Sequence, residues 1–155
     1  MVDGGATRAQ SVSNALAAVG TELVAIHDAA RPLVTSELID AVVATLFEDP
    51  DAAGAIAATP VADTIKRAKD GSVDSTLDRG ELWAAQTPQV FRVEELRAAM
   101  AGDSERIAAA TDEAMLIEGA GGRVAIHPAP AENLKVTTPV DLKLAELLLA
   151  ERSGE

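Results

Sequence analysis

Short apolar runs alternate along the chain with longer segments whose apolar residues recur at helical spacing. The helical pattern predicts helices at 7–19, 35–46, 93–101, 112–118 and 139–149. The short apolar runs predict buried strands at 23–26, 53–58, 124–126 and 134–136. Alternating strands and helices of these lengths are typical of α/β proteins, in which crossover helices connect parallel strands. We therefore expect an α/β fold with a mostly parallel sheet.

The middle of the chain, at about residues 62–82, breaks this alternation. Asp70-Gly71 is a strong turn signal between two polar and β-branched flanks, so residues 63–78 are predicted to form a β-hairpin. Both strands are too polar to lie in a core, and we expect the hairpin to project from the body as an arm. Two interpretations stay open: an arm that grips a partner, or a hairpin that is simply solvated.

Composition limits the class of protein. The 155 residues suffice for one domain, residues 1–155, with a sizeable core. Aromatic residues make up only 2% of the chain, so aliphatic side chains must fill that core. The lack of cysteine excludes disulfides, thiolate metal sites and a cysteine nucleophile. No apolar run has the length of a membrane span and no signal-peptide pattern opens the chain, so we expect a cytoplasmic protein with no membrane partner.

The charge balance is strongly acidic. A net charge of −12 without any basic tract argues against binding to nucleic acid. An acidic protein that binds phosphate must gather its few cations in one place. The cations that fall in or beside predicted loops are Arg8, Arg31, Arg79 and Lys135.

The hexapeptide His27–Pro32 directly follows the predicted strand 23–26. Ligands of open α/β sheets bind just outside the carboxyl ends of the strands. Asp28 is a possible ligand for a metal or a hydroxyl group, and Arg31 is a possible ligand for phosphate. Pro32 disfavours direct continuation into a helix. The alternative is an ordinary turn in which Asp28 and Arg31 pair with each other.

Other polar segments also lie at predicted strand ends or loops. Gly4–Arg8 precedes a helix, so its free N–H groups could meet a base or a phosphate, or it could be a linker. Gln86–Gln89 offers hydroxyl and amide groups in an expected rigid turn. Thr111 is expected to cap the next helix, although a cap hydroxyl can also meet a phosphate. Lys135 lies between two apolar residues of a predicted strand, where it is either catalytic or an edge lysine whose ammonium reaches water.

These segments together resemble one enzyme family. The motifs that carry the resemblance are Gly4-Gly5-x-x-Arg8-x-x-Ser11-Val12, His27–Pro32, Asp63–Arg67, Gln86–Gln89, Thr111–Glu113 and Asn133–Thr137. Their order matches that of the 2-C-methyl-D-erythritol 4-phosphate cytidylyltransferases, from Gly4 to about Glu151. The resemblance implies a Rossmann-like nucleotidyltransferase fold. It also implies a homodimer that uses Mg²⁺ to join CTP and methylerythritol phosphate into a CDP-alcohol and pyrophosphate, in non-mevalonate isoprenoid biosynthesis.

The resemblance also implies roles for individual residues. Asp28 would hold Mg²⁺, and Lys135 and Arg79 would be catalytic. The residues that would contact the cytosine and the ribose are Gly5, Ala6, Ser11 and Ala29. The residues that would bind the second substrate are Arg31, Thr64, Thr87 and Thr111. The hairpin would be the dimerisation arm, at about residues 62–82, so that Thr64 and Arg79 would act in the partner's site.

The chain departs from the family pattern at its start. Family members open with a strand and a glycine-rich loop that wraps the CTP triphosphate, and no segment here matches them, as if the N-terminal third were absent. We therefore expect these 155 residues alone not to turn over CTP, and strand 23–26 to present an open edge. Two alternatives remain: the related ribitol-phosphate cytidylyltransferases, which Ala29-Ala30 fits slightly less well, and a non-catalytic dimerising fragment that binds nucleotide.

Overall fold

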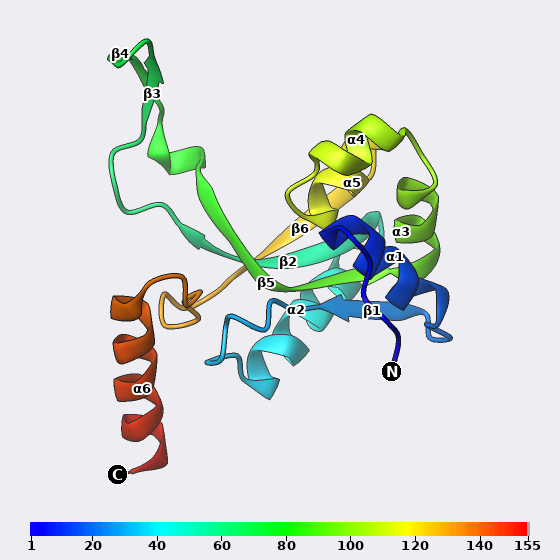
Figure 1. Ribbon diagram of the computed structural model, residues 1–155, viewed down its shortest axis with the longest axis horizontal. Coiled ribbons are helices and arrows are strands. Elements are labelled where there is room, and N and C mark those ends of the chain that lie inside the picture. Colours follow the sequence, from blue (N-terminus) through cyan, green and yellow to red (C-terminus); the bar gives the residue numbers. More distant parts are fainter. Residues whose placement is uncertain (155) are drawn as a thin grey trace.

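The computed structural model describes residues 1–154, which form an α/β fold around a mixed four-stranded sheet (Figure 1). In spatial order its strands are β1 (Leu23–Ile26), β5 (Trp83–Arg92), β2 (Ala52–Pro60) and β6 (Arg123–Pro128). β2 and β6 are parallel, whereas β5 runs antiparallel to both of its neighbours. The predicted α/β class is confirmed, and three of the four strands share one direction. The expected parallel pairing holds only for β2 and β6, because β5 returns from the arm directly alongside β2.

Helices cover both faces of the sheet. α2 (Ser36–Glu48) packs on one face, where its apolar residues meet alanines of β2 and Val90 of β5. The helices of the other face are α1 (Arg8–Ala17), α3 (Val93–Met100), α4 (Ser104–Ala109) and α5 (Glu113–Gly119). Neighbouring residues of one strand serve opposite cores: Val90 faces α2, and Phe91 faces α3 and α5. This alternation produces three layers from a core with few aromatic residues.

Threonine side chains cap three of the helices. Thr7 caps α1 and Thr35 caps α2, each accepting a hydrogen bond from a backbone N–H of the first turn. Thr138 and Asp141 form a capping box at α6 (Pro139–Ser153). Hydrogen bonds from Thr137 and Thr138 lower the pKa of Asp141 to about 2. α4 was not predicted, since its six residues are too few to show an apolar period.

Three local predictions are wrong. Asp112, not Thr111, caps α5, because its carboxylate accepts the N–H of Met115. Residues 134–136 form a loop instead of a strand, since Val136 bonds the loop after β1 through the carbonyl of Ala30 rather than joining the sheet. Gln86–Gln89 is not a turn but lies within β5, with a cis Thr87–Pro88 peptide. This polar segment is thus the middle part of a strand whose flanking residues are mostly apolar.

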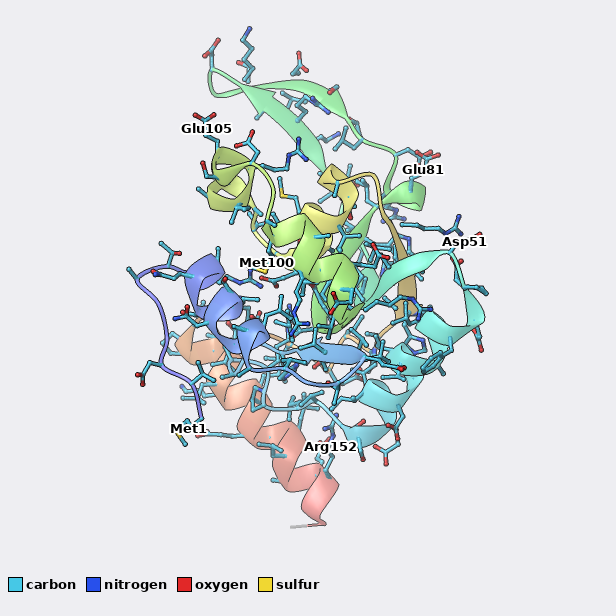
Figure 2. The ribbon with its side chains drawn as sticks, turned by 90° about the vertical axis from the view of Figure 1, so that its right-hand side faces the viewer. Met1, Asp51, Glu81, Met100, Glu105 and Arg152 are labelled. Carbon is cyan, nitrogen blue, oxygen red and sulfur yellow. The ribbon has the colours of Figure 1, made fainter. Side chains whose placement is uncertain are left out.

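The arm is present as predicted. β3 (Lys66–Lys69) and β4 (Ser72–Thr76) pair as an antiparallel hairpin, and the short helix η1 (Arg79–Glu81) leads back to β5. Asp70 and Gly71 have φ angles of 50° and 77°, the left-handed conformation that an Asp-Gly hairpin turn requires. The hairpin stands clear of the body in Figure 1, and its side chains point into solvent in Figure 2.

Two apolar surfaces remain open in the described part of the chain. β1 is an edge strand of the sheet, as expected, and its residues are only partly buried. α6 meets the body through buried Ala145 and through Arg152, which donates to the carbonyl of Leu33. The large apolar residues that α6 exposes are Val140, Leu142, Leu144, Leu147 and Leu149. Among the described residues, no helix combines the length and the apolar character needed to cross a bilayer.

The tightest packing in the sheet yields a stability prediction. A Cβ on Gly54 of β2 would overlap the ring of Phe91, whereas a Cβ on Gly20 would meet nothing within 4 Å. Gly54→Ala should therefore lower the free energy of unfolding by about 1–3 kcal/mol, because neither Phe91 nor the strand can move freely in a filled core. Gly20→Ala is the matched control. Urea unfolding of both variants checks this, and equal stabilities would contradict it.

Candidate active site

A polar cavity of about 330 Å³ lies where the loop after β1 meets β5, the start of α5 and the loop after β6. Its lining includes five residues predicted from the sequence as site residues: Asp28, Arg31, Thr87, Thr111 and Lys135. A larger cavity of about 470 Å³ between α1, α3 and α4 contains Arg8 as its one charged residue. Because several ionisable and amide side chains converge in the smaller cavity, we regard it as the candidate active site.

Asp28 is the centre of charge in this cavity. The Nζ of Lys135 lies 2.9 Å from Asp28 Oδ2, and the Nε of Arg31 lies 3.9 Å from the same oxygen. Burial raises the pKa of Asp28, but the hydrogen bond and charge of Lys135, with the charges of Arg31 and Arg8, outweigh it, so the pKa lies below its usual value. Burial also lowers the pKa of Arg31, and Asp28 opposes that effect. Two cations thus face the Asp28 carboxylate, and such cations are groups that can bind a phosphate, although Asp112 adds a second carboxylate to the cavity lining.

Lys135 occupies this position from a loop rather than from the expected buried strand. Its side chain is 47% exposed, so burial does not explain its orientation. Both interpretations of Lys135 assumed a strand that the structure does not contain. The side chain is half exposed, as an edge lysine would be, and its ammonium contacts Asp28. The expected pairing of Asp28 with Arg31 is present as well, but as the longer of the two ion pairs.

Thr87 holds the turn that carries Asp28. Its hydroxyl accepts a hydrogen bond from the N–H of Asp28 and lies 2.9 Å from Nδ1 of His27. Nε2 of His27 lies 3.1 Å from the carbonyl of Arg31, which can only accept, so Nε2 carries the proton and Nδ1 accepts from Thr87. The Thr87 hydroxyl, predicted to bind substrate, therefore has two partners already within the protein.

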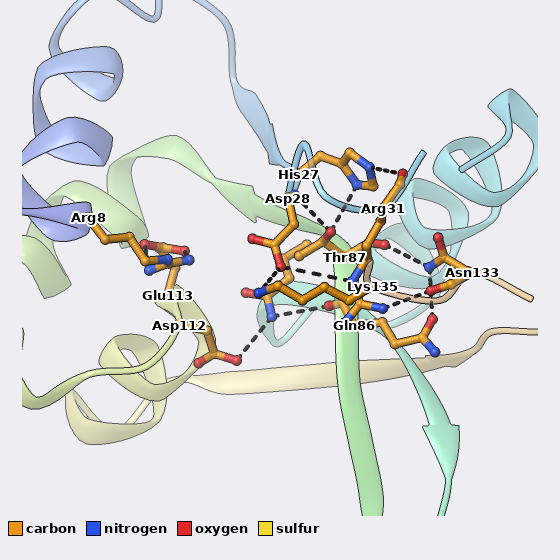
Figure 3. A network of polar contacts seen from close by, with 11 residues as sticks. Arg8, His27, Asp28, Arg31, Gln86, Thr87, Asp112, Glu113, Asn133 and Lys135 are labelled. Carbon is orange, nitrogen blue, oxygen red and sulfur yellow. Dashed lines mark hydrogen bonds and ion pairs between the residues drawn. The ribbon is translucent and has the colours of Figure 1, made fainter. Parts of the chain in front are cut away.

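A network of buried amides forms the floor of the cavity (Figure 3). Asn133 is 1% exposed, and its Nδ2 donates to Oε1 of Gln86 at 2.8 Å and to the carbonyl of Thr87 at 2.9 Å. The backbone carbonyl of Asn133 accepts a hydrogen bond from Nη1 of Arg31 at 2.7 Å. Gln89 then donates to a carboxylate oxygen of Asp112 at 3.1 Å. The network thus joins β5, α5 and both loops.

The network also holds the buried side-chain polar atoms that have no hydrogen-bond partner within the described part of the chain. They are Nε of Arg31, Oε1 of Gln89 and Oδ1 of Asn133. Unpaired polar atoms are rare in protein interiors and here gather at one place. The sequence singled out the Gln86–Gln89 and Asn133–Thr137 segments but assigned no role to these amides. The signal available in the sequence was the pair of amide residues, Gln86 and Gln89, in a segment flanked by apolar residues.

Arg8 is not a free cation. Both of its terminal nitrogens lie 2.6 Å from the carboxylate oxygens of Glu113, a side chain that is only 1% exposed. These hydrogen bonds raise the pKa of Arg8. The pair joins the first residue of α1 to the first residue of α5. Arg8, expected to be a local cation for phosphate, is therefore neutralised, and Glu113 reads in the sequence only as a common first-turn carboxylate.

The remaining predicted site residues lie outside this cavity. The N–H of Gly5 donates to the hydroxyl of Ser11 at 2.9 Å, and the N–H of Ala6 donates to Gln10, so the groups expected to meet cytosine are bonded locally. Ala29 is exposed on the turn after β1. Thr64 and Arg79 are exposed on the arm, where Arg79 donates to the carbonyl of Ala62.

The carboxylates of the structure can be compared with those that the expected Mg²⁺ ion would need. Within residues 1–154, no group of three or more His, Cys, Asp and Glu side chains could hold a metal ion. Mg²⁺ commonly takes only one or two protein carboxylates and completes its shell with water and substrate phosphates. The single carboxylate of Asp28, about one quarter exposed in the cavity, fits that mode of binding.

The Arg8–Glu113 pair yields a prediction. Arg8→Ala should lower the free energy of unfolding by about 3 kcal/mol, because it leaves a buried carboxylate without its counter-charge. Adding Glu113→Gln to this variant should restore part of the loss. Arg123→Ala, which breaks an exposed pair with Asp49, is the control and should cost less than about 1 kcal/mol. Urea unfolding measures all three, and similar losses for Arg8→Ala and Arg123→Ala would refute the prediction.

Comparison with known proteins identifies the family. The family model of the 2-C-methyl-D-erythritol 4-phosphate cytidylyltransferases matches residues 1–151. The enzyme of that name from Bacillus licheniformis is 45% identical over 157 residues, which cover 100% of this chain and 67% of the relative. The enzyme from Rubrobacter xylanophilus is 48% identical, covering 96% of this chain and 64% of the relative. The chain thus spans about two thirds of the length of these relatives.

Solved structures give the same result. The crystal structure of the enzyme from Thermus thermophilus superposes with a TM-score of 0.83 at 35% identity, covering 95% of this chain and 71% of that one. The Francisella tularensis enzyme superposes with a TM-score of 0.84 at 32% identity, covering 94% and 69%. With the cavity formed by the motifs of the sequence, these matches show that the chain belongs to the 2-C-methyl-D-erythritol 4-phosphate cytidylyltransferase family.

Proposed function

We propose that this protein transfers CMP from CTP to 2-C-methyl-D-erythritol 4-phosphate, giving CDP-methylerythritol and pyrophosphate in non-mevalonate isoprenoid biosynthesis. The observation that carries the proposal is the convergence of Lys135, Arg31 and Asp28 in one cavity of a chain that belongs to this family. Two of the few cations of a protein of net charge −12 lie together here, which favours a phosphate-bearing substrate.

The chemistry requires positioning more than proton transfer. An oxygen of the methylerythritol phosphate forms a bond to the α-phosphorus of CTP, and the bond from that phosphorus to the bridging oxygen of the β-phosphate breaks. Because the attacking group is already an anion, no strong base is needed. The protein must align two anions that repel each other and neutralise the charge of the transition state. Lys135 and Arg31 are placed to do both.

Asp28 has two roles in this proposal. In the described structure it holds the ammonium of Lys135, and with substrates bound it would hold Mg²⁺ together with phosphate oxygens. When bound, the ion supplies further neutralisation of charge on the reacting phosphates. The neighbouring cations, Lys135 first among them, keep Asp28 ionised by holding its pKa below the usual value. Thr111 lines the same cavity and offers a hydroxyl to the second substrate.

The nucleotide would lie on the side of the cavity where α1 begins. Arg8 lines the cavity from the first residue of α1, so Gly5, Ala6 and Ser11 are near neighbours of the cavity in the chain. Their backbone and hydroxyl groups would exchange their local hydrogen bonds for bonds to the cytosine. Ala29, exposed on the turn beside Asp28, would contact the ribose.

The arm would join two subunits. Its strands are fully exposed, and Thr64 and Arg79 lie on it, outside the cavity of their own chain. In a homodimer of a cytoplasmic enzyme, with no nucleic acid and no membrane as partner, each arm would bring these two residues to the site of the other subunit. Arg79 would then add the cation that the neutralised Arg8 does not supply.

Lys135 provides the first test. In the full natural chain, Lys135→Ala should lower kcat by about 10³-fold or more, because it removes a charge that stabilises the transition state. Its stability should change little, since the side chain is half exposed. Lys143→Ala, an exposed lysine on α6, is the control. Pyrophosphate release from CTP and methylerythritol phosphate is the assay.

Other outcomes of that assay would refute specific parts of the proposal. Ordinary turnover by Lys135→Ala would overturn its catalytic role. Turnover by the unaltered protein with ribitol phosphate but not with methylerythritol phosphate would identify the other branch. Absence of turnover with either substrate, with CTP still bound, would identify a non-catalytic nucleotide-binding protein.

The arm provides a second test. A heterodimer of Asp28→Ala and Arg79→Ala subunits would contain one site with both lesions and one with neither. Mixing the two inactive variants should therefore restore part of the activity once the subunits have exchanged. If no activity returns after exchange has been confirmed by mass spectrometry of the mixed dimers, Arg79 does not serve the neighbouring subunit.

A further inference from the structure

Neither membership of the sheet nor burial explains why the side chain of Lys135 is held against Asp28. The residue lies in the loop between β6 and α6, outside the sheet, and its side chain is 47% exposed. A solvated lysine on a free loop would lose much conformational entropy by holding one contact. Its ammonium nevertheless lies 2.9 Å from Asp28. The backbone of this loop must therefore be fixed nearby.

Asn133, two residues before Lys135, is the fixed point. It is 1% exposed and forms hydrogen bonds with three other residues of the site. Its Nδ2 holds the side chain of Gln86 and the carbonyl of Thr87, both in β5, and its own carbonyl holds Nη1 of Arg31. On the far side of Lys135, Val136 donates to the carbonyl of Ala30 at 2.8 Å. The backbone is thus fixed by hydrogen bonds on both sides of Lys135, at Asn133 and at Val136.

The chemistry of the contacts specifies the side chain at this position. Oε1 of Gln86 and the carbonyl of Thr87 are both acceptors, so one short side chain must donate two hydrogen bonds from a single atom. Asparagine does this with its NH₂ group, whereas a carboxylate offers no donor and a hydroxyl only one. The site is also fully buried, where an acceptor left without a donor is unfavourable.

We propose that Asn133 is the positioning residue that sets Lys135 against Asp28 and holds Arg31 in place for phosphate binding. This inference rests on the proposed function for the role of the two cations. Asn133 touches no reacting atom. It acts by fixing the backbone from which Lys135 projects and by occupying one guanidinium nitrogen of Arg31. Figure 3 shows these residues converging from separate elements.

Lysine reactivity tests the positioning without any need for turnover. The chain has four lysines, so acetylation of Lys135 can be compared by mass spectrometry with that of Lys66, Lys69 and Lys143 in the same molecule. In the unaltered protein, the contact with Asp28 should make Lys135 the slowest to react. In Asn133→Ala, its rate should rise toward that of the other three. Asn133→Ser, which keeps one donor, should be intermediate and serves as the milder variant if Asn133→Ala does not fold.

A control separates positioning from general loosening of the fold. Leu96→Ala creates a cavity in the core between α3 and α5, and Leu96 belongs neither to the network nor to the cavity lining. It should lower the melting temperature but leave the relative rate at Lys135 unchanged. An unchanged rate in folded Asn133 variants, or an equal rise in Leu96→Ala, would overturn the proposal.

Steady-state kinetics on the full natural chain give the second measurement. Asn133→Ala should lower kcat by about 100-fold, since displacing a catalytic group by about 1 Å has effects of this size. Its KM for CTP should change far less, and Leu96→Ala should keep its kcat below its melting temperature. If even the unaltered protein does not turn over, the proposed function fails, whereas the acetylation rates still decide whether Asn133 positions Lys135.

Discussion

The ion pair between Lys135 and Asp28 is the contact on which the organisation of the site depends. It joins the loop after β1 to the loop after β6, two segments more than one hundred residues apart in the sequence. Arg31 approaches the same carboxylate from the other side, so that two positive charges face one negative charge. In a chain with net charge −12, two of the few cations are thus held together by geometry at one place.

Holding that geometry requires polar groups where a sheet is normally apolar. β5 passes through the centre of the sheet with Gln86, Thr87 and Gln89 buried in it. Each side chain makes hydrogen bonds to the loops or to α5, and the network is incomplete only at three atoms next to the cavity. A buried polar network that is nearly satisfied favours one arrangement of its members, because any alternative leaves donors or acceptors unpaired. The rigidity of the floor and the placement of the cations therefore have the same origin.

The outer parts of the molecule differ from the site in that much of their surface is exposed. The arm, the edge strand β1 and helix α6 all present surface that their own chain does not cover. The arm is polar and suited to a reversible, specific contact, whereas β1 and α6 expose aliphatic residues. Since the three-layer core lies between these surfaces and involves neither the arm nor α6 to any large extent, the site can keep its internal geometry independently of them.

The sequence by itself determined the local elements. Apolar periodicity located most helices and three sheet strands, and Asp70-Gly71 located the arm. These features depend on residues close in the chain, and so a local pattern can predict them. The motifs also indicated which side chains belong to the site, and five of them do line one cavity.

Only the tertiary structure decided how these parts are paired. β5 enters the sheet antiparallel, Lys135 leaves from a loop, Arg8 is neutralised by Glu113, and Asn133 bonds β5 rather than solvent. Each outcome depends on groups that lie far apart in the sequence, and no periodicity reports which of several cations will meet which carboxylate. Burial determines which groups pair, because Glu113 and Asn133 lose their contact with water when the layers pack together. Each must then form its hydrogen bonds with the groups that the packing places next to it.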